Sequence, residues 1–469
     1  MKFGGSSLAS PARIRRAAEI VQRFSTENSI VAVVSAMDDV TDRLAEIAES
    51  VQRGETRRAE ALLSRLHRFH TSAAISIGQK SSRKDLVTST NALNQELEKT
   101  VKGISHLREV TPRSRDYLLS FGERFTVPIF SAALKSLGLK AKPMTEAETG
   151  ITTDDNFGEA KPLIEVSYDQ LRKRLEPLLT RKQIPVVAGF IATTVDGNLT
   201  TLGRGGSDYT ASLIGAALAA DEVWIWTDVD GLMTADPRIV KTSRILENVS
   251  FGEALELSYF GAKMMHPRAL QPASIRKIPV RIKNSSKPNG RGTLVSATES
   301  KDTGRVVKAV SMIRDVGIVT VNGAGMVGAP GVAAKVFQTL GSNRVNVIMI
   351  SQGSSEATIS TVVARRDVDR AVRALQLALL GRGQVDKIQK EKNACIIAVV
   401  GSGMKGTPGV AARVFGAVAN RKVNVRMVAQ GSSEYNVSFV VSDKEGPEAV
   451  RAIHEEFSLG VPDPDSRGP

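Results

Sequence analysis

The sequence predicts an α/β protein, a three-layer sandwich followed by two ferredoxin-like βαββαβ units. Three observations support this fold class. Apolar runs of strand length alternate with helical segments throughout residues 1–285, as in SIVAVVSA (29–36) and EVWIWTD (222–228). Residues 286–305 are rich in Ser, Gly, Pro and charge, which indicates a linker. Beyond this linker, one segment of sequence occurs twice.

The apolar runs predict a largely parallel sheet, because continuous apolar sequence is typical of strands that are buried on both faces. Further runs of this kind occupy 184–192 and 278–284. The first helix is expected to begin at Ser10-Pro11, since serine is a favoured helix cap and proline is favoured in the first turn. Residues 42–110 are expected to form a long helical insertion with an arginine-rich polar side.

The repeat predicts the two smaller units. GMVGAPGVAAKVF (325–337) returns as GMKGTPGVAARVF (403–415), and VNVIMISQGSSE (345–356) returns as VNVRMVAQGSSE (423–434). In both pairs the second copy follows the first at the same offset in residue number, so the two copies align without a gap. Each copy has the pattern strand, glycine-rich turn, helix, strand, turn, strand, which is part of a ferredoxin-like unit. Two copies are too few for a solenoid and favour a pair of small domains.

Each copy also contains a G-x-G-x-x-G match, GAGMVG (323–328) and GSGMKG (401–406). A dinucleotide site would need an acidic residue at the end of the next strand, but Gln352 and Gln430 stand there. We therefore interpret these glycines as tight strand-to-helix turns that allow the close approach of a small ligand.

The composition excludes several classes of protein. The net charge is +14, but aromatic residues make up only 4% and the basic residues are dispersed, so no nucleic-acid partner is expected. The single cysteine, Cys395, excludes an intramolecular disulfide and favours a cytoplasmic protein. No apolar run is long enough to span a bilayer, and no presequence is expected because the first motif begins at residue 2. The five histidines lack the spacing of metal ligands, so no metal site is expected.

The first motif is Lys2-Phe3-Gly4-Gly5-Ser6-Ser7. Its glycines let backbone N–H groups approach an anion, and the dipole of the following helix favours negative charge. Lys2 would stand at the end of a strand as a point cation. An ordinary glycine-rich turn explains the residues equally well when they are taken alone.

Two further segments have weaker patterns. Ser35 and Thr41 follow a buried strand, and their hydroxyls suit either a bound carboxylate or a capped turn. Glu123 follows a glycine and suits an ammonium group, although its local sequence favours a glutamate on a helix surface.

The loop GRGGSD is more specific, because it places Arg204, Gly205, Ser207 and Asp208 before an apolar helix. Arginine in a glycine loop suits bidentate recognition of carboxylate or phosphate. Asp208 suits either a helix cap or the orientation of cations around a phosphoryl group.

The last segments are TDVDGLMTADPR (227–238) and FGAKMMHP (260–267). Arg238 and Lys263 add two cations that suit a polyphosphate. Together the motifs supply cations, anion-binding loops and one placed aspartate, but no pair of nucleophile and base. Phosphoryl transfer needs such a set, because its catalysis consists mainly of positioning and charge neutralisation.

KFGGSS, GRGGSD, TDVDGLMTADPR and FGAKMMHP, in this order, resemble the motifs of the aspartate kinases of the amino-acid kinase superfamily. The repeat resembles their paired ACT domains. The resemblance implies a cytoplasmic, monofunctional kinase that transfers the γ-phosphate of ATP to the side-chain carboxylate of L-aspartate and gives 4-phospho-L-aspartate. This reaction is the first step of lysine, threonine and methionine biosynthesis. Mg²⁺ would be held mainly by the nucleotide.

The resemblance also implies a role for each motif residue. Lys2 and Asp208 would be catalytic, with Lys2 neutralising the transferring group and Asp208 orienting the lysines. The ATP site would comprise Lys2, Gly4, Gly5, Ser6, Thr227, Asp228, Met233, Arg238 and Lys263. The aspartate site would comprise Ser35, Thr41, Glu123, Arg204, Gly205 and Ser207. Many relatives carry an aromatic residue where this chain has Met233, so a thioether would meet the adenine here.

Regulation by an amino acid is implied by the ACT resemblance, with Met326, Gln352 and Gln430 as the regulatory residues and threonine favoured over lysine. The first ACT unit (316–385) would be inserted in the second (306–315 with 386–462), followed by a tail (463–469). Such units imply a homodimer or a dimer of dimers. Two alternatives stay open: another kinase of the superfamily, such as a glutamate 5-kinase or a uridylate kinase, and a non-catalytic amino-acid sensor.

Overall fold

The computed structural model describes residues 1–260, 265–297, 305–381, 383–431 and 435–461, and it divides the chain into two compact units. The first unit comprises Met1–Leu232, Glu247–Phe251 and Met264–Thr298. The second unit comprises Met233–Leu246, Gly252–Lys263 and Glu299–Pro469. Part of the predicted domain 1–285 therefore belongs to the second unit, and the predicted tail 463–469 lies outside the described residues.

The first unit is built on an eight-stranded sheet with the order β3-β5-β2-β1-β8-β10-β11-β9. The strands from β3 to β10 in this order are parallel, whereas β11 is antiparallel to β10. Their bounds are β1 (Lys2–Phe3), β2 (Ala32–Val34), β3 (Ala141–Met144), β5 (Ile184–Ala188), β8 (Val223–Thr227), β9 (Asn248–Ser250), β10 (Val280–Asn284) and β11 (Thr293–Ser296). Residues 286–305 are thus not a linker throughout, because β11 forms within them and pairs with β10 and β9.

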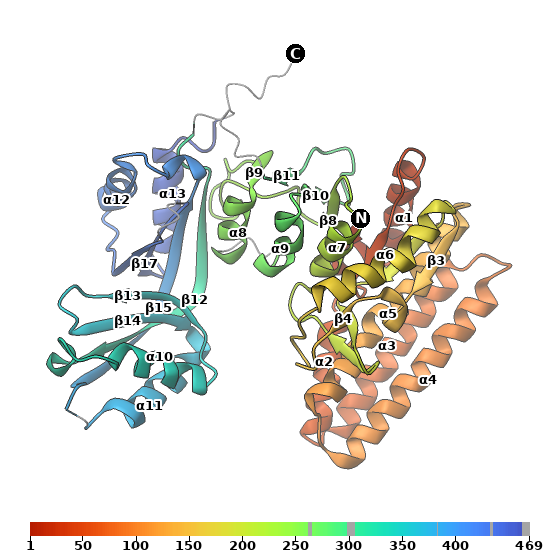
Figure 1. The fold of residues 1–469 in the computed structure, drawn as a ribbon, viewed down its shortest axis with the longest axis horizontal. Coiled ribbons are helices and arrows are strands. Elements are labelled where there is room, and N and C mark those ends of the chain that lie inside the picture. The colour runs from red at the N-terminus through yellow and green to blue at the C-terminus, as the bar shows by residue number, and fades with distance from the viewer. Residues whose placement is uncertain (261–264, 298–304, 382, 432–434, 462–469) are drawn as a thin grey trace. The chain divides into compact units, whose positions relative to one another are not determined.

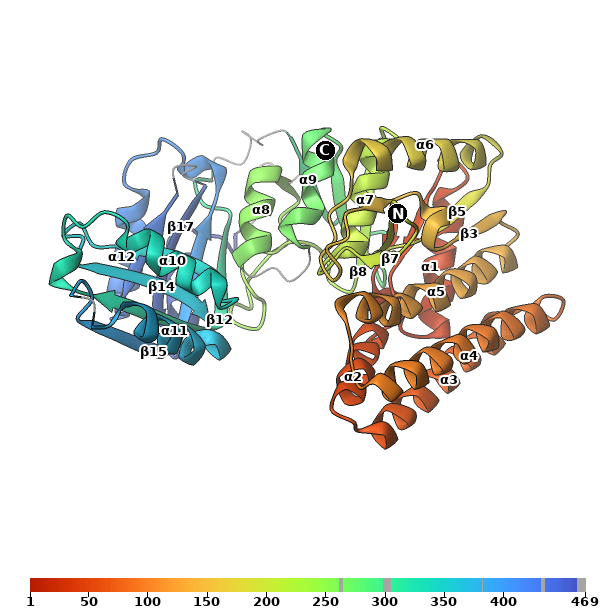
Figure 2. The same cartoon turned by 60° about the horizontal axis from the view of Figure 1, so that its bottom comes forward.

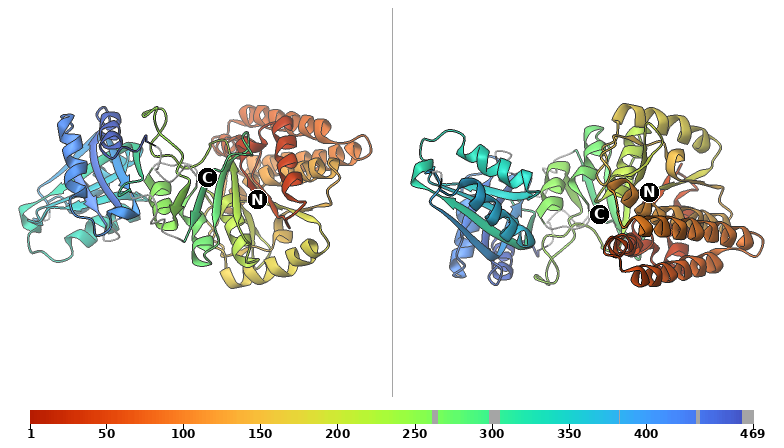
Figure 3. Two further views of the ribbon diagram at one scale, coloured as in Figure 1. Left: turned by 90° about the horizontal axis from the view of Figure 1, so that it is seen from above. Right: turned by 90° about the horizontal axis from the view of Figure 1, so that it is seen from below.

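Helices cover both faces of this sheet, which confirms the predicted layered α/β fold (Figure 3). Phe3 stacks on Trp226 and packs against Phe130, so α1 and α5 lie on the face to which Phe3 points. Lys2 points to the opposite face, where it meets α7, because successive strand residues alternate between faces. The bounds are α1 (Pro11–Phe24), α5 (Pro112–Ser136), α6 (Ile164–Thr180), α7 (Gly206–Ala217) and α9 (Pro267–Ile275). The Ser10 side chain caps α1 by accepting from the Arg13 N–H, as predicted.

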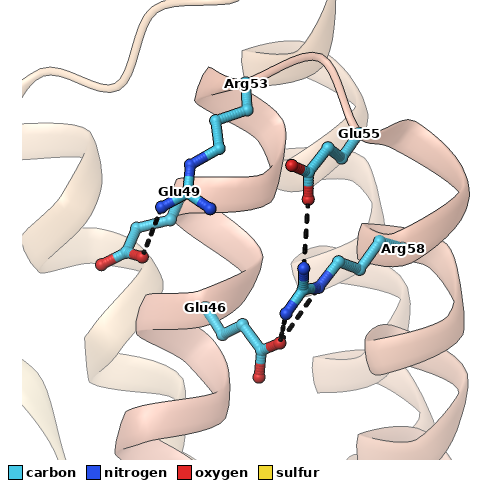
Figure 4. A network of polar contacts seen from close by, with 5 residues as sticks. All are labelled: Glu46, Glu49, Arg53, Glu55 and Arg58. Atoms are coloured by element: carbon cyan, nitrogen blue, oxygen red, sulfur yellow. Dashed lines mark hydrogen bonds and ion pairs between the residues drawn. The ribbon is translucent and has the colours of Figure 1, made fainter.

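The predicted helical insertion is confirmed as α2 (Val40–Gln52), α3 (Thr56–Ile77) and α4 (Arg83–Leu107), with α3 and α4 packed side by side (Figure 2). Its arginines lie on solvated faces. Arg58 contacts Glu46 at 2.6 Å and Glu55 at 3.5 Å across the α2–α3 turn (Figure 4). Exposed pairs of this kind contribute little to stability, so the basic surface is solvated and locally paired.

A small second sheet in the first unit consists of β4 (Thr152–Thr153), β6 (Ile191–Thr194) and β7 (Leu199–Thr201). Asp116 of α5 is fully buried and connects this sheet to the helix. Its carboxylate accepts from the N–H groups of Gly158 (2.9 Å) and Thr201 (2.8 Å) and from the Thr201 hydroxyl (2.8 Å). Because β7 leads directly into the 202–208 loop, Asp116 fixes the approach to that loop.

The second unit contains a six-stranded sheet with the order β13-β14-β12-β15-β17-β16 (Figure 1). The strands are β12 (Ala309–Asn322), β13 (Val347–Gln352), β14 (Thr358–Ala364), β15 (Lys387–Val400), β16 (Met427–Gln430) and β17 (Asn436–Ser442). The helices are α10 (Val332–Ser342), α11 (Val368–Leu379), α12 (Val410–Asn420) and α13 (Gly446–Glu456), together with α8 (Phe251–Phe260), which begins at the boundary between the units.

The two long strands β12 and β15 join two halves of this sheet. In the first half, Val316–Asn322 pair with β14 and with the start of β15, and α10 and α11 cover the core. In the second half, Ala309–Ile313 pair with Val400–Ile396, and α12 and α13 cover a separate core that contains Val307 and Val310. The register of β12 and β15 shifts between Ile313 and Ile318, where one half gives way to the other. Residues before this shift therefore belong to the half that ends the chain.

Within the described residues, no helix combines the length and the apolar character that crossing a membrane would require.

We predict that Asp116→Ala lowers the free energy of unfolding of the first unit by about 3 kcal/mol, because it removes the buried carboxylate that accepts from the N–H groups of Gly158 and Thr201 and from the Thr201 hydroxyl. Tryptophan fluorescence during urea titration measures this, since Trp224 and Trp226 are the two tryptophans of the chain and both lie in the first unit. Asp196→Ala, at an exposed position between β6 and β7, is the control and should shift stability by less than about 0.5 kcal/mol. Equal unfolding midpoints for the two variants would contradict the assignment.

Candidate active site

The centre of the site is a buried ion pair between the first strand and α7. The Lys2 ammonium lies 2.6 Å from Asp208 Oδ1, and the two side chains are only 10% and 9% exposed. Lys2 is fixed although β1 has two residues, because β1 pairs with β2 on one side and β8 on the other. Asp208 stands in the first turn of α7. Burial makes such an ion pair costly in free energy, because both charges lose their hydration. Each charge is stable there only beside its partner, and this requirement fixes the positions of both side chains.

The glycines after Lys2 allow close approach of the neighbouring backbone. A Cβ built on Gly5 would lie 2.8 Å from the carbonyl oxygen of Asp38, a distance that no side chain tolerates. A Cβ on Gly4 would lie 3.5 Å from the Lys2 nitrogen, at ordinary van der Waals contact. The Gly4 N–H donates to Trp226 O, and the turn continues as a 3-10 helix over Gly5–Leu8 that includes Ser6. The loop therefore lies against both β8 and the 36–38 segment.

Glu123 lies inside the protein, and the expectation of a surface glutamate is wrong. Glu123 is 2% exposed. One oxygen of its carboxylate accepts the Ala36 N–H at 2.9 Å, and the other oxygen has no hydrogen-bond partner among the described residues. Burial raises the pKa of Glu123 to about 8, while the backbone hydrogen bond and the charge of Lys2 oppose that rise. Gly122 makes this position possible, because a Cβ there would lie 2.6 Å from the Ala36 Cβ.

Ser35 and Thr41 border the same place. Ser35 extends β2, and its N–H donates to Phe3 O at 3.1 Å. The Thr41 hydroxyl lies 3.7 Å from the position of a Cβ on Gly122. Both residues are half-buried, and the 35–41 segment that carries them also supplies the Ala36 N–H to the Glu123 carboxylate.

The 202–208 loop requires its glycines. Gly203 and Gly205 have φ values of 73° and 72°, in the left-handed region that favours glycine. A Cβ on Gly205 would lie 2.6 Å from the Cβ of His266, whose ring nitrogen caps α9 by accepting from the Arg268 N–H. His266 thus has a structural role. Arg204 in the same loop is exposed.

Ser207 is buried against Gly189, where a Cβ would lie 2.6 Å from its own Cβ. The loop therefore packs tightly on the end of β5. This contact and the left-handed glycines fix the start of α7, and hence Asp208, relative to the sheet.

Two serines of the site were given no role by the sequence analysis, Ser7 of the first motif and Ser285. The Ser7 hydroxyl donates to the Ser285 hydroxyl at 2.8 Å, and Ser285 donates through its N–H and its hydroxyl to Thr227 O. Ser285 directly follows β10, so its place at the carboxyl end of a strand was the signal that could have identified it. The Thr227 hydroxyl in turn donates to the Asp228 carboxylate at 3.1 Å.

The remaining predicted ATP residues lie outside the first unit or outside the described residues. Met233 and Arg238 belong to the second unit, where Met233 forms a bridge with Ile245. Arg238 is exposed, and its guanidinium binds both oxygens of Asp236. Lys263 lies outside the described residues.

The predicted regulatory residues also lie in the second unit. Met326 is buried in the turn before α10, whereas Gln352 and Gln430 are exposed at the ends of β13 and β16.

Known proteins resemble this chain in sequence. The model of the amino acid kinase family matches residues 1–284, and that of the ACT domain matches 319–379 and 397–457. Aspartokinase 1, chloroplastic, of Arabidopsis thaliana is 34% identical over 97% of this chain and 79% of that protein. A bifunctional aspartokinase/homoserine dehydrogenase of Zea mays is also 34% identical, over 98% of this chain, which spans 50% of its length.

Solved structures of aspartokinases are also similar to this chain. Escherichia coli aspartokinase III in complex with aspartate and ADP superposes with a TM-score of 0.82 and 27% identity, covering 97% of this chain and 98% of the other. The same enzyme with lysine and aspartate gives 0.76 and 28% identity, with the same coverage of both chains. The chain belongs to the amino acid kinase family, in the aspartokinase branch that carries paired ACT domains.

Proposed function

We propose that the chain is an aspartate kinase, which transfers the γ-phosphate of ATP to the side-chain carboxylate of L-aspartate and forms 4-phospho-L-aspartate. The observation that carries this proposal is the buried Lys2–Asp208 pair, which stands beside a glycine turn at the carboxyl ends of parallel strands. Ligands of open α/β sheets bind at such ends. The ADP and aspartate of the E. coli relative support the choice of substrates.

In the proposed reaction, the aspartate carboxylate attacks the γ-phosphorus directly and ADP leaves, with no phospho-enzyme. The Lys2 ammonium neutralises charge on the transferring phosphoryl group, and Asp208 holds that ammonium in place at 2.6 Å. The Gly4–Ser6 turn, with Thr227 and Asp228, serves the nucleotide. Mg²⁺ enters with ATP and is held mainly by its phosphates. Met233, Arg238 and Lys263 complete the ATP site on the argument from sequence.

Glu123 is the proposed partner of the substrate ammonium. A buried carboxylate with one free oxygen is unfavourable until a cation reaches it, so substrate binding removes the cost of its burial. Ser35 and Thr41 are the proposed hydroxyl ligands of the substrate, on the same segment whose Ala36 N–H donates to Glu123. Arg204, exposed in its loop, is the proposed ligand of an aspartate carboxylate, and Gly205 and Ser207 shape that loop.

Amino-acid inhibition at the ACT domains completes the proposal, with Met326, Gln352 and Gln430 at the effector sites. The lysine bound to the E. coli relative supports an amino-acid effector, and the two QGSSE turns are our reason for favouring threonine. We further propose assembly through these domains into a homodimer or a dimer of dimers. An assay of ADP release with aspartate, glutamate and uridine monophosphate as acceptors distinguishes this function from another kinase of the superfamily and from a sensor.

We predict that Lys2→Met lowers kcat by about a thousandfold or more, because it removes the cation that meets the transferring phosphoryl group. ADP release measures the rate, and circular dichroism checks that the variant is folded, since Asp208 loses its buried partner. Lys2→Arg keeps the charge and should retain measurable activity. A folded Lys2→Met protein with a rate within tenfold of wild type would refute the role of Lys2.

We predict that kcat/KM for aspartate rises with pH up to about 8 and then levels off. Below its raised pKa, Glu123 is mostly protonated and neutral, and must lose a proton before it can pair with the ammonium. The slope should approach about tenfold per pH unit. Glu123→Gln should raise KM for aspartate and remove this pH dependence. A wild-type profile that is flat from about pH 6 to 8 would contradict the assignment.

We predict that Gln352→Ala weakens effector inhibition and raises the inhibitor concentration needed for half inhibition by about tenfold, which corresponds to the loss of one or two hydrogen bonds to the effector. Inhibition is titrated with threonine and lysine, separately and together. Gln430→Ala, at the equivalent position of the repeat, shows whether both halves bind effector. An unchanged inhibition curve in Gln352→Ala would remove that residue from the site.

A further inference from the structure

The 3-10 turn that follows β1 reaches past the neighbouring strand. In the sheet, β1 lies next to β8, and β10 lies on the other side of β8. The Ser7 hydroxyl of the turn nevertheless donates at 2.8 Å to the hydroxyl of Ser285, the residue that directly follows β10. Neighbouring strands lie about 4.8 Å apart, so β1 and β10 are about 10 Å apart within the sheet. The turn therefore crosses the carboxyl end of β8.

The crossing is hydrogen-bonded to the end of β8. The Gly4 N–H donates to Trp226 O at 3.1 Å, and the Ser7 hydroxyl lies 3.4 Å from the same oxygen. Ser285 donates to Thr227 O through its N–H at 2.9 Å and through its hydroxyl at 3.1 Å. The last two carbonyl groups of β8 are thus bonded to the turn on one side and to the end of β10 on the other.

The two serine hydroxyls form a chain with one direction. A hydroxyl has a single hydrogen to donate. The hydrogen of Ser7 is directed to Ser285, and the hydrogen of Ser285 is directed to Thr227 O. Ser7 is 2% exposed and Ser285 is 7% exposed, so water does not readily replace either partner. A change at one serine is therefore expected to act through the other.

The residues after β10 hold the residues after β8 at further points. The Asn284 side chain donates to Asp228 O at 3.3 Å and to the Asp230 carboxylate at 2.6 Å. The Lys287 ammonium contacts the same carboxylate at 2.7 Å. Together with the two bonds from Ser285 to the carbonyl before them, these contacts fix both the backbone and a side chain of the segment that follows β8.

The whole network lies in the first unit and in the described part of the chain. It connects the Gly4–Ser6 turn to Thr227 and Asp228, which the proposed function assigns together to the nucleotide. Hydrogen bonds that hold two such segments at a fixed separation before binding reduce the ordering that binding must otherwise impose. The serines need no contact with the nucleotide to have this effect.

We propose that Ser285 and Ser7 are positioning residues for the nucleotide, and that their hydroxyl pair sets the separation between the turn after β1 and the end of β8. The inference rests on the proposed function, because it takes the Gly4–Ser6 turn and Thr227 as parts of the nucleotide site. Neither serine belongs to the Lys2–Asp208 pair, so kcat is expected to stay within about threefold of wild type when the hydroxyl pair is lost.

Ser285→Ala tests the pair, because it removes the hydroxyl that links Ser7 to Thr227 O and adds no bulk. We expect a rise of about fivefold in KM for ATP and in the Kd for MgADP measured by titration calorimetry, as for the loss of one hydrogen bond. KM for aspartate should change by less than about twofold. Ser285→Thr keeps the hydroxyl and should bind MgADP within about twofold of wild type. The control is Ser286→Ala, at the exposed neighbouring residue, which should leave all three constants unchanged.

Ser7→Ala is the second test and decides the outcome if Ser285→Ala does not fold. It should cause the same loss, and the double variant should lose no more than either single variant, because both substitutions remove one unit.

A folded Ser285→Ala or Ser7→Ala protein with unchanged KM for ATP and unchanged Kd for MgADP would overturn the inference. Losses that multiply in the double variant, an equal rise in KM for aspartate, or an equal loss in Ser285→Thr would overturn it as well. If wild type binds MgADP but releases no ADP with aspartate, the proposed function fails, whereas the Kd for MgADP of the variants still decides the role of the hydroxyl pair.

Discussion

The site depends on one costly interaction, the buried pair of Lys2 and Asp208. Two charges removed from water are retained only where their separation is fixed, and here it is fixed from two directions. The strand that carries Lys2 lies in the middle of a parallel sheet, and the helix that carries Asp208 begins in a loop with two left-handed glycines. The close approaches at Gly5, Gly122 and Gly189 bring the surrounding segments against this pair without side chains that would hold them apart.

The site also holds a third buried ionisable group, the carboxyl of Glu123. Glu123 lies close enough to Lys2 for the ammonium to oppose the rise of its pKa, yet burial still keeps that pKa near 8. Its free oxygen needs a donor that the described residues do not supply. The ammonium group of an amino-acid substrate would donate to this oxygen and would bring a positive charge to the buried carboxylate. The desolvation that makes this carboxylate unfavourable without substrate therefore increases selectivity for an amino-acid substrate. The arrangement stores unfavourable energy at the position where substrate is proposed to bind.

The sequence predicted the parts of the fold that periodicity encodes. The apolar runs and the gap-free repeat predicted the layered sheet and the paired units, and the glycine motifs indicated where backbones approach. Features set by tertiary contact were out of reach. Glu123 has the sequence surroundings of a surface helix residue, and only the packing of Gly122 on Ala36 buries it. Thr293–Ser296 resemble part of a loop because Gly and Arg precede them, but pairing with β10 and β9 makes them a strand. Ser285 lies in a polar stretch with no motif around it, and its contact with Ser7 spans 278 residues of sequence.

The repeat in the second unit shows why similar sequence does not imply similar function. The equivalent turns Gly323–Met326 and Gly401–Met404 keep the glycines and the methionine, which satisfy the same backbone geometry, and differ in what accepts one N–H group. With Asp386 the first half needs no outside group, whereas with Lys308 the second half is complete only when the Glu253 carboxylate of α8 enters it. A single reversal of charge thus turns a self-sufficient module into one that must bind another part of the chain. Because an unsatisfied buried N–H and an unpaired ammonium are both unfavourable, the second half and α8 are expected to order together.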